Sequence, residues 1–164
     1  MKRTITLLIC VAVLMGIAAA SHAEGLMGRN EINGSAAWIK VEDLKLTLAG
    51  VNYGRFVTPN VEAQLGVLYL KPSGEDSSYA LAPAVSYHFI SPSTTTTVPY
   101  VGAGYYWLKL AGEKENNWEA FAGVKFFLDG NYSTAKTAAF LEYRYLKIAS
   151  TSINTVWAGL ATFF

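Results

Sequence analysis

The chain contains 164 residues, 52% of them hydrophobic and 15% charged, and its formal net charge is +1. A near-neutral chain without a basic stretch argues against a nucleic-acid partner. Its one cysteine excludes an internal disulfide framework and any metal site made of several thiolates.

The N-terminus has the pattern of a secretory signal peptide. Lys2 and Arg3 precede an apolar run over residues 5–20, and residues 21–23 (SHA) supply the small side chains of a cleavage site. This order predicts cleavage after residue 23. An uncleaved membrane helix would need about 20 apolar residues, and Cys10 lies inside the apolar run, which argues against a lipoprotein acceptor.

Cleavage leaves residues 24–164 as a single domain. This part has 141 residues, no cysteine and a formal charge of −1, and its length suits one domain. The whole chain holds 10 Tyr, 8 Phe and 4 Trp. An exported, aromatic-rich chain whose apolar residues alternate with polar ones is typical of an outer-membrane barrel.

Eight segments of roughly ten residues read as strands, the length that a tilted strand needs to cross a bilayer. The breaks between them are rich in the Gly, Pro, Asn, Asp and Ser residues of turns. The expected strands are residues 31–40, 44–56, 61–71, 79–90, 98–109, 117–128, 138–147 and 154–164.

The charges of the third to eighth strands fall on one face over residues 61–69, 79–89, 101–107, 118–126, 139–145 and 156–164. Over these residues the opposite face is uncharged, as Leu65 and Val67 illustrate in the third strand. A soluble barrel would leave that apolar face in water, as a patch far larger than monomers tolerate. In lipid the same pattern is expected, with apolar side chains outward and polar ones inward. We therefore predict an all-β fold, an eight-stranded antiparallel up-and-down transmembrane β-barrel.

The first two strands follow the pattern less well. Leu46 and Leu48 alternate with polar neighbours, but Val51 and Tyr53 then take the outward parity. A β-bulge near residues 49–50 would switch the face of the strand. We therefore expect a bulge there.

Outward aromatic residues fall into two belts if both termini are periplasmic. Two rings of amphipathic side chains at the membrane interfaces are typical of such barrels. The extracellular belt would contain Tyr69, Tyr79, Trp107, Trp118 and Tyr145, and the periplasmic belt Tyr87, Phe89, Phe126 and Phe164.

Three motifs and the terminal Phe164 resemble the small outer-membrane β-barrel family. The motifs are residues 56–62 (FVTPNVE), 99–104 (PYVGAG) and 141–145 (LEYRY). That family, within the porin-like superfamily, includes the OmpA-type transmembrane domain and the OmpX-like proteins. The resemblance implies a bacterial outer-membrane location and a last strand that the barrel assembly machinery recognises. The outward residues of that strand are Val156, Ala158, Leu160, Thr162 and Phe164.

Four inward charges form the candidate site. Glu62, Lys125, Glu142 and Arg144 would face the lumen, where charges without water must be paired. Interiors of eight-stranded barrels are just wide enough for side chains. We therefore expect a packed polar lumen and a structural or surface-interaction role in the envelope, with a narrow porin-like channel gated by these charges as the alternative.

A lipid-modifying enzyme is a third hypothesis, since Glu62, His88 and Ser91 can be written as a triad. Nothing in the sequence indicates an oxyanion site, or places the nucleophile and the base within hydrogen-bond distance of each other. We expect no catalytic residue, no cofactor and no metal, and we read the acidic residues 74–76 and 113–115 as solvated turns. The predicted loops are short, whereas recognition of a large partner usually depends on long loops. We therefore expect a monomer whose partner is the surrounding outer-membrane lipid.

Overall fold

The computed structural model describes residues 26–41, 44–73, 77–90, 96–110, 113–148 and 151–164. The predicted signal peptide, Ser91 and the acidic residues 74–76 lie outside these ranges. All the regular structure of the described residues is β-strand. Within these ranges no helix has the length and hydropathy needed to cross a membrane.

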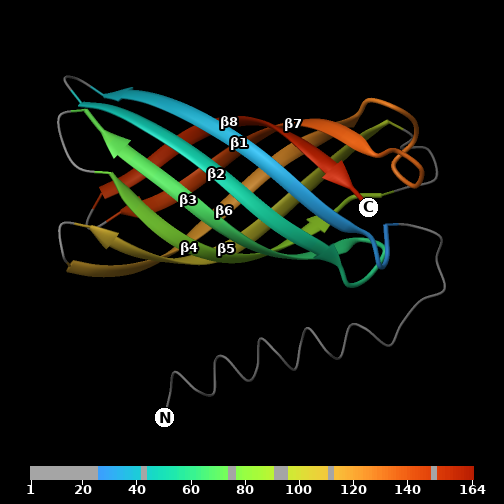
Figure 1. The fold of residues 1–164 in the computed structure, drawn as a ribbon, viewed down its shortest axis with the longest axis horizontal. Coiled ribbons are helices and arrows are strands. Elements are labelled where there is room, and N and C mark those ends of the chain that lie inside the picture. Colours follow the sequence, from blue (N-terminus) through green and yellow to red (C-terminus); the bar gives the residue numbers. More distant parts are fainter. Residues whose placement is uncertain (1–25, 42–43, 74–76, 91–95, 111–112, 149–150) are drawn as a thin grey trace, which may run out of the picture.

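The described residues form eight strands that close into a barrel (Figure 1). Each strand pairs antiparallel with the next, and β8 returns to β1. The predicted all-β up-and-down barrel is therefore confirmed. The strands are β1 (Asn30–Val41), β2 (Leu44–Phe56), β3 (Val61–Pro72), β4 (Ser78–His88), β5 (Thr97–Leu110), β6 (Glu113–Phe127), β7 (Thr137–Ile148) and β8 (Thr151–Phe163).

The two ends of the barrel differ in their connections. We call the end at which β1 begins and β8 finishes the terminal end, and the opposite end the far end. At the far end, two residues separate β1 from β2, β5 from β6 and β7 from β8. The ladder therefore extends through polar residues that the sequence suggested were turns, such as Asn116, which pairs with Trp107. This is why β6 and β8 start earlier than expected.

The predicted bulge in β2 is wrong. The register between β2 and β3 runs residue for residue through Ala49↔Tyr69 and Gly50↔Leu68. Leu48 is buried with an exposed fraction of 1%, so it faces the lumen on the same parity as Gly50. The apparent change of face in the hydrophobic pattern of β2 arises because the lumen is apolar at this height. The inward leucines there have the pattern that is expected of residues facing lipid.

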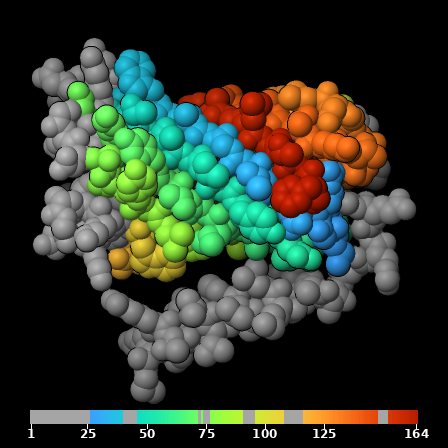
Figure 2. All heavy atoms as spheres, viewed as in Figure 1, coloured from blue at the N-terminus to red at the C-terminus, as the bar shows by residue number. Residues whose placement is uncertain are grey.

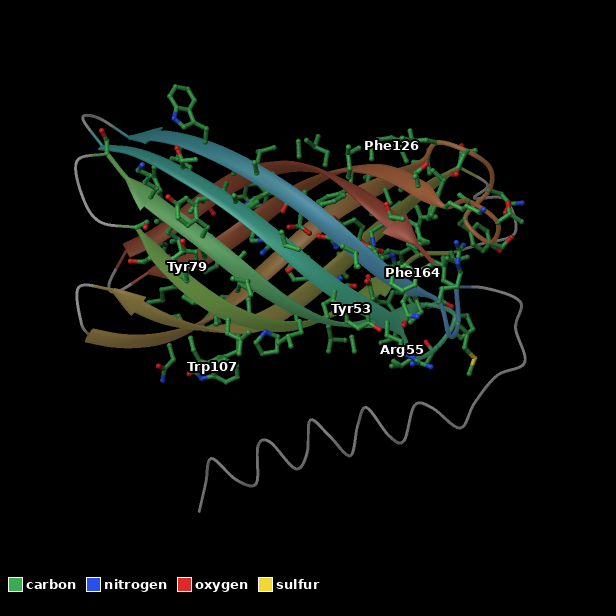
Figure 3. All side chains as sticks on the ribbon, in the orientation of Figure 1. Tyr53, Arg55, Tyr79, Trp107, Phe126 and Phe164 are labelled. Atoms are coloured by element: carbon green, nitrogen blue, oxygen red, sulfur yellow. The ribbon has the colours of Figure 1, made fainter. Side chains whose placement is uncertain are left out.

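The outer surface is apolar and carries aromatic side chains toward both ends. Tyr79 and Trp107 lie toward the far end, and Phe126 and Phe164 toward the terminal end (Figure 3). In the space-filling view, β8, β1, β2 and β3 follow one another around the visible face (Figure 2). Most residues of the two predicted belts are exposed, and Tyr69 and Tyr145 are half-buried. The outward aromatic residues that the belts omitted are Trp38, Tyr53, Tyr105 and Tyr143.

A close approach between β8 and β1 requires glycine at position 159. A Cβ there would overlap the backbone oxygen of Gly34 and the ring of Phe140. Gly34 itself faces outward, and the nearest atom to a Cβ at that position would be 4.0 Å away. The two glycines therefore differ in what a side chain would meet.

We expect Gly159→Val to lower the free energy of unfolding by about 1–3 kcal/mol, since overpacking displaces backbone and ring atoms. The measurement is urea unfolding in lipid vesicles. The folded fraction at each urea concentration is read from the difference in gel mobility between unheated and boiled samples. Gly34→Val is the matched control and should change stability by less than about 0.5 kcal/mol. Equal losses in the two variants would contradict the close approach.

Candidate functional site

The candidate site is the lumen, which is filled in three layers. A single strand shows their order, because inward residues alternate along β7. From the terminal end, Phe140 belongs to an apolar layer, Glu142 and Arg144 to an ionic layer, and Leu146 to a second apolar layer. Successive inward residues of β7, two positions apart in the sequence, therefore belong to successive heights in the lumen.

The terminal apolar layer closes the lumen where the chain enters and leaves the barrel. Leu26, just before β1, is fully buried in it, and so are Phe56 and Phe163. Among the described residues, the buried members of the layer are Leu26, Phe56, Val98, Phe127, Ala135, Ala138, Phe140, Ala161 and Phe163.

The connection between β6 and β7 lies over this layer. Arg29 donates hydrogen bonds to the carbonyl oxygens of Tyr132 (3.1 Å) and Ala135, which anchors the connection beside β1. The backbone N–H groups of Thr137 and Lys136 donate to Asp129, and they hold the pKa of that carboxyl below its ordinary value. The terminal end is therefore capped by an ordered segment.

The first part of the ionic layer is organised by Lys125. Its ammonium, only 2% exposed, forms ion pairs with Glu31 on β1 and, at 3.4 Å, with Glu62 on β3. Asn33 donates to the other oxygen of Glu31 at 2.8 Å. Because Lys125 belongs to β6, these ion pairs span the lumen rather than join neighbouring strands.

Glu62 accepts several hydrogen bonds through a single oxygen. Gln64 donates to Oε2 at 2.9 Å, and the His88 ring nitrogen Nε2 lies 3.0 Å away. A Cβ at position 54 on β2 would overlap the other oxygen, Oε1, so Gly54 leaves room for the carboxylate. Among the described residues, Oε1 has no hydrogen-bond partner.

The second part of the ionic layer is organised by Arg144. Its Nη2 lies 2.6 Å from Glu142 Oε1 on the same strand, and its Nη1 lies 3.2 Å from Glu119 Oε2 on β6. The guanidinium carbon lies over the rings of Phe121 and Trp157, at 5.1 and 5.0 Å from their centroids. Both distances allow cation–π attraction, which adds to the ion pairs with the carboxylates.

Tyr100 connects the two parts of the ionic layer. Its hydroxyl donates to Glu142 at 3.0 Å, while its ring stacks on His88 at 5.2 Å and lies 5.4 Å from the Lys125 ammonium. The charged groups therefore form one connected layer across the barrel.

The four charges singled out from the sequence lie in this layer as two separate pairs. Glu62 contacts Lys125, and Glu142 contacts Arg144. Lys125 and Glu142 lie on neighbouring strands, but Lys125 pairs with Glu31 and Glu62 across the lumen. Glu31 was not among the four charges singled out from the sequence, although its spacing of two from Asn33 puts both side chains on the same face.

The described lumen carries more acidic than basic side chains. The carboxyl groups of Glu31, Glu62, Glu119 and Glu142 are buried with only two permanent cations, Lys125 and Arg144. Each cation is therefore shared by two carboxyl groups. Loss of either cation would leave two acidic groups without a charged partner.

The geometry around His88 does not support a catalytic triad. Ser86 lies beside the ring, with Oγ 3.0 Å from Nε2, and the predicted Ser91 lies outside the described residues. Glu62 contacts the same nitrogen, and Nδ1 has no partner among the described residues. A triad needs the nucleophile on one ring nitrogen and the acid on the other.

No group of three or more His, Cys, Asp or Glu residues in the described part of the chain could hold a metal ion.

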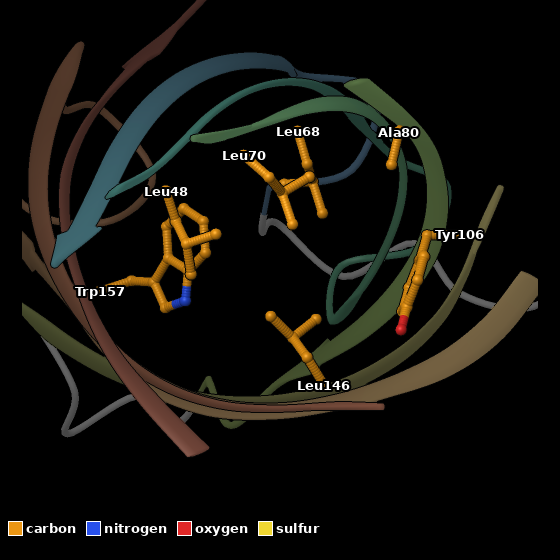
Figure 4. A pocket seen from close by; sticks show the side chains of 7 residues that line it. All are labelled: Leu48, Leu68, Leu70, Ala80, Tyr106, Leu146 and Trp157. Carbon is orange, nitrogen blue, oxygen red and sulfur yellow. The ribbon is translucent and has the colours of Figure 1, made fainter. Parts of the chain in front are cut away.

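The far apolar layer closes the other end of the lumen. Seven of its residues surround a small cavity, which leaves about 10 Å³ in which the centre of a water molecule could move (Figure 4). A space of this size with an apolar lining is expected to stay dry. The layer consists of Ala37, Leu46, Leu48, Leu68, Leu70, Ala80, Ala82, Tyr106, Leu146 and Trp157. The predicted packed polar lumen is therefore polar only in its middle.

No protein-family model and no curated protein sequence matches the chain. Solved structures match in fold. The N-terminal β-barrel domain of Pseudomonas aeruginosa OprF superposes with a TM-score of 0.63 at 18% identity, covering 84% of this chain and 98% of that domain. A designed transmembrane β-barrel gives 0.60 at 16% identity, with 84% and 97% covered. The outer membrane protein OprG of Pseudomonas aeruginosa gives 0.53 at 12% identity, with 86% and 98% covered. The chain thus has the fold of small outer-membrane barrels.

We expect Lys125→Met to destabilise the barrel by about 3–5 kcal/mol, because Glu31 and Glu62 would remain buried without their cation. Urea unfolding in lipid vesicles measures the loss. Lys136→Met, in the exposed connection between β6 and β7, is the matched control and should have little effect. Adding Glu31→Gln and Glu62→Gln to Lys125→Met should recover part of the stability. If Lys125→Met were as stable as the control, the ion pairs across the lumen would not hold the layer.

Proposed function

We propose that the protein is an integral barrel of the bacterial outer membrane with a closed lumen, and that its role in the envelope is structural. The observation that carries the proposal is the filling of the lumen by two apolar layers and an ionic layer between them. Ions cross a barrel only where water can follow, and an eight-stranded interior is readily filled by side chains. The filling of the lumen by these three layers argues against a hydrated path through it.

Support for a membrane location comes from the outer surface. Large apolar side chains are exposed on every strand, including Val67, Leu141 and Leu160, which are 49%, 52% and 65% exposed. Lipid contact removes the cost that water would impose on such a surface. Outward charges on the described strands are confined to the ends of the barrel, where Arg55, Lys71 and Lys147 lie.

The exported chain is inferred to belong with the small barrels that include the OmpA-type transmembrane domain and the OmpX-like proteins. Val156, Leu160 and Phe164 face outward along β8, where the barrel assembly machinery could bind them as a signal. Outer-membrane lipid is the expected partner of a barrel that acts as a monomer.

The short far-end connections favour a structural role over recognition of a large partner. With periplasmic termini, the far end faces the outside of the cell. Only two residues separate the strands in three of its four hairpins, whereas nine separate β6 from β7 at the terminal end. Outer-membrane barrels usually show the reverse, with long outward loops, and recognition depends on loops.

A narrow channel gated by Glu62, Lys125, Glu142 and Arg144 is the second candidate function. The excess of acidic groups in the ionic layer favours a channel, because a passing cation could pair with a carboxylate in place of Lys125 or Arg144. Opening would also require both apolar layers to separate.

We expect the purified barrel in planar lipid bilayers to show no discrete current steps, and Arg144→Ala to show none either, because the apolar layers remain. A general porin added to the same bilayer verifies that steps would be detected. Reproducible unitary openings of the wild-type protein, altered by Arg144→Ala, would refute the closed lumen and establish the channel.

A further inference from the structure

The ladder that closes the barrel is incomplete at the far end. β1 and β8 pair from Glu31↔Phe163 to Ala36↔Ala158, and no pair follows among the described residues. Residues 37–41 of β1 and 151–157 of β8 continue as strands without pairing with each other. We call this stretch the open seam. The other neighbouring pairs of strands keep their ladders at least as far as the far apolar layer. β6 and β7 pair up to Glu119↔Leu146, and β7 and β8 pair up to Ile148↔Thr151.

Trp157 is the largest side chain on the inner side of the open seam. Trp157 on β8 is fully buried, and its ring extends behind β1 to β2, where a Cβ at Gly50 would lie 3.7 Å from its Cζ3 atom. Its indole nitrogen donates to Thr155 on its own strand at 2.6 Å. That hydrogen bond therefore does not tie β8 to β1.

The cavity of the far apolar layer lies directly behind this side chain. Trp157 lines it together with Leu48 and Leu68, and all of its exposed lining is apolar (Figure 4). Below, the guanidinium of Arg144 lies 5.0 Å from the Trp157 ring, so the ionic layer forms the floor. Ile39 and Ile153, on the two strands of the seam, pack against the same layer.

The surroundings of the cavity determine what could enter it. From the terminal end, the ionic layer blocks any apolar molecule, because passage would strip the charges of their partners. From the side, the open seam separates the cavity from the surrounding lipid by side-chain contacts alone. Leucine side chains and one indole can move apart without breaking a backbone ladder.

A second interruption lies in the wall between β4 and β5. Pro83 lacks an N–H, and neither Ala82 nor Pro83 pairs with β5. The ladder resumes at Ala80↔Leu108 and Leu81↔Trp107, so this wall is held on both sides of the gap. The open seam has no such pair beyond it and is the easier route.

We infer that the far apolar layer is a binding site for the end of one lipid acyl chain, which enters from the bilayer between residues 37–41 of β1 and 151–157 of β8. The site rests on the membrane location of the proposed function and adds a lipid-binding role to it. Trp157 is the side chain that must swing aside to admit the chain. The lipid headgroup stays outside the barrel, at the height of the exposed Trp38.

The test is a set of nuclear Overhauser effects in nanodiscs of dimyristoylphosphatidylcholine, with the protein deuterated except at leucine methyl groups. We expect cross-peaks between lipid methylenes and the inward Leu48 and Leu68. Leu65 and Leu141 face outward and should give strong cross-peaks, whereas Leu26 in the terminal apolar layer should give none. Absence of cross-peaks at Leu48 and Leu68, with Leu65 and Leu141 positive, would overturn the binding site and leave the membrane location intact. Absence at all of these leucines would refute the membrane location itself.

Two cysteine pairs test the route. Trp38→Cys with Val156→Cys would face each other if the ladder continued for two more residues, and bridging them closes the open seam. Ala36→Cys with Ala158→Cys bridges an existing ladder pair and is the matched control. Where no disulfide forms in the first pair, a short bis-thiosulfonate reagent bridges it. We expect the Leu48 cross-peak to fall to the level of Leu26 in the first variant and to persist in the control. Equal Leu48 cross-peaks in the two cysteine variants would exclude the open seam as the route. Cross-peaks from Leu48 to a second copy of the protein, and none to lipid, would contradict the binding of an acyl chain.

Discussion

Pairing of charges inside a space without water is the constraint on which this structure depends. Eight strands enclose an interior that side chains fill, so every inward charge must find its partner inside the barrel. Lys125 meets this requirement by reaching Glu31 and Glu62 across the lumen. Arg144 meets it by pairing with Glu142 on its own strand and with Glu119 on the neighbouring β6. The resulting layer ties β1, β3, β6 and β7 together independently of their ladders.

The apolar layers follow from the same constraint. Ion pairs keep their strength only where water is excluded, and the layers above and below exclude it from both mouths of the barrel. The terminal layer is completed by Leu26 and by the connection that Arg29 anchors, so residues beside the strands take part. The far layer ends instead at an unpaired stretch of wall, and the two ends of the lumen are therefore not equivalent. One is capped by the chain itself, whereas at the other Trp157 lies on the inner side of the unpaired stretch.

Much of the fold could be predicted from the sequence, because the period of two fixes which residues share a face. The face of the third to eighth strands, the antiparallel order and the inward position of the four singled-out charges all follow from it. The rule that apolar residues face lipid failed in β2, where Leu46 and Leu48 face an apolar lumen. Partners across the barrel could not be predicted, since the sequence sets neighbours along a strand but not the distance from Lys125 to Glu31. The early end of the ladder between β1 and β8 likewise has no signal in the residues on either side of it.

The most direct test of the water-free ionic layer is hydrogen exchange at the Lys125 ammonium in lipid nanodiscs, observed by nitrogen-15 NMR. The closed lumen predicts a resonance for Lys125 that exchanges slowly with water and gives cross-peaks to protons near Glu31 and Tyr100. The exposed Lys136 supplies the reference for fast exchange. Exchange of Lys125 as fast as that of Lys136 would mean that water fills the lumen, and it would contradict the account.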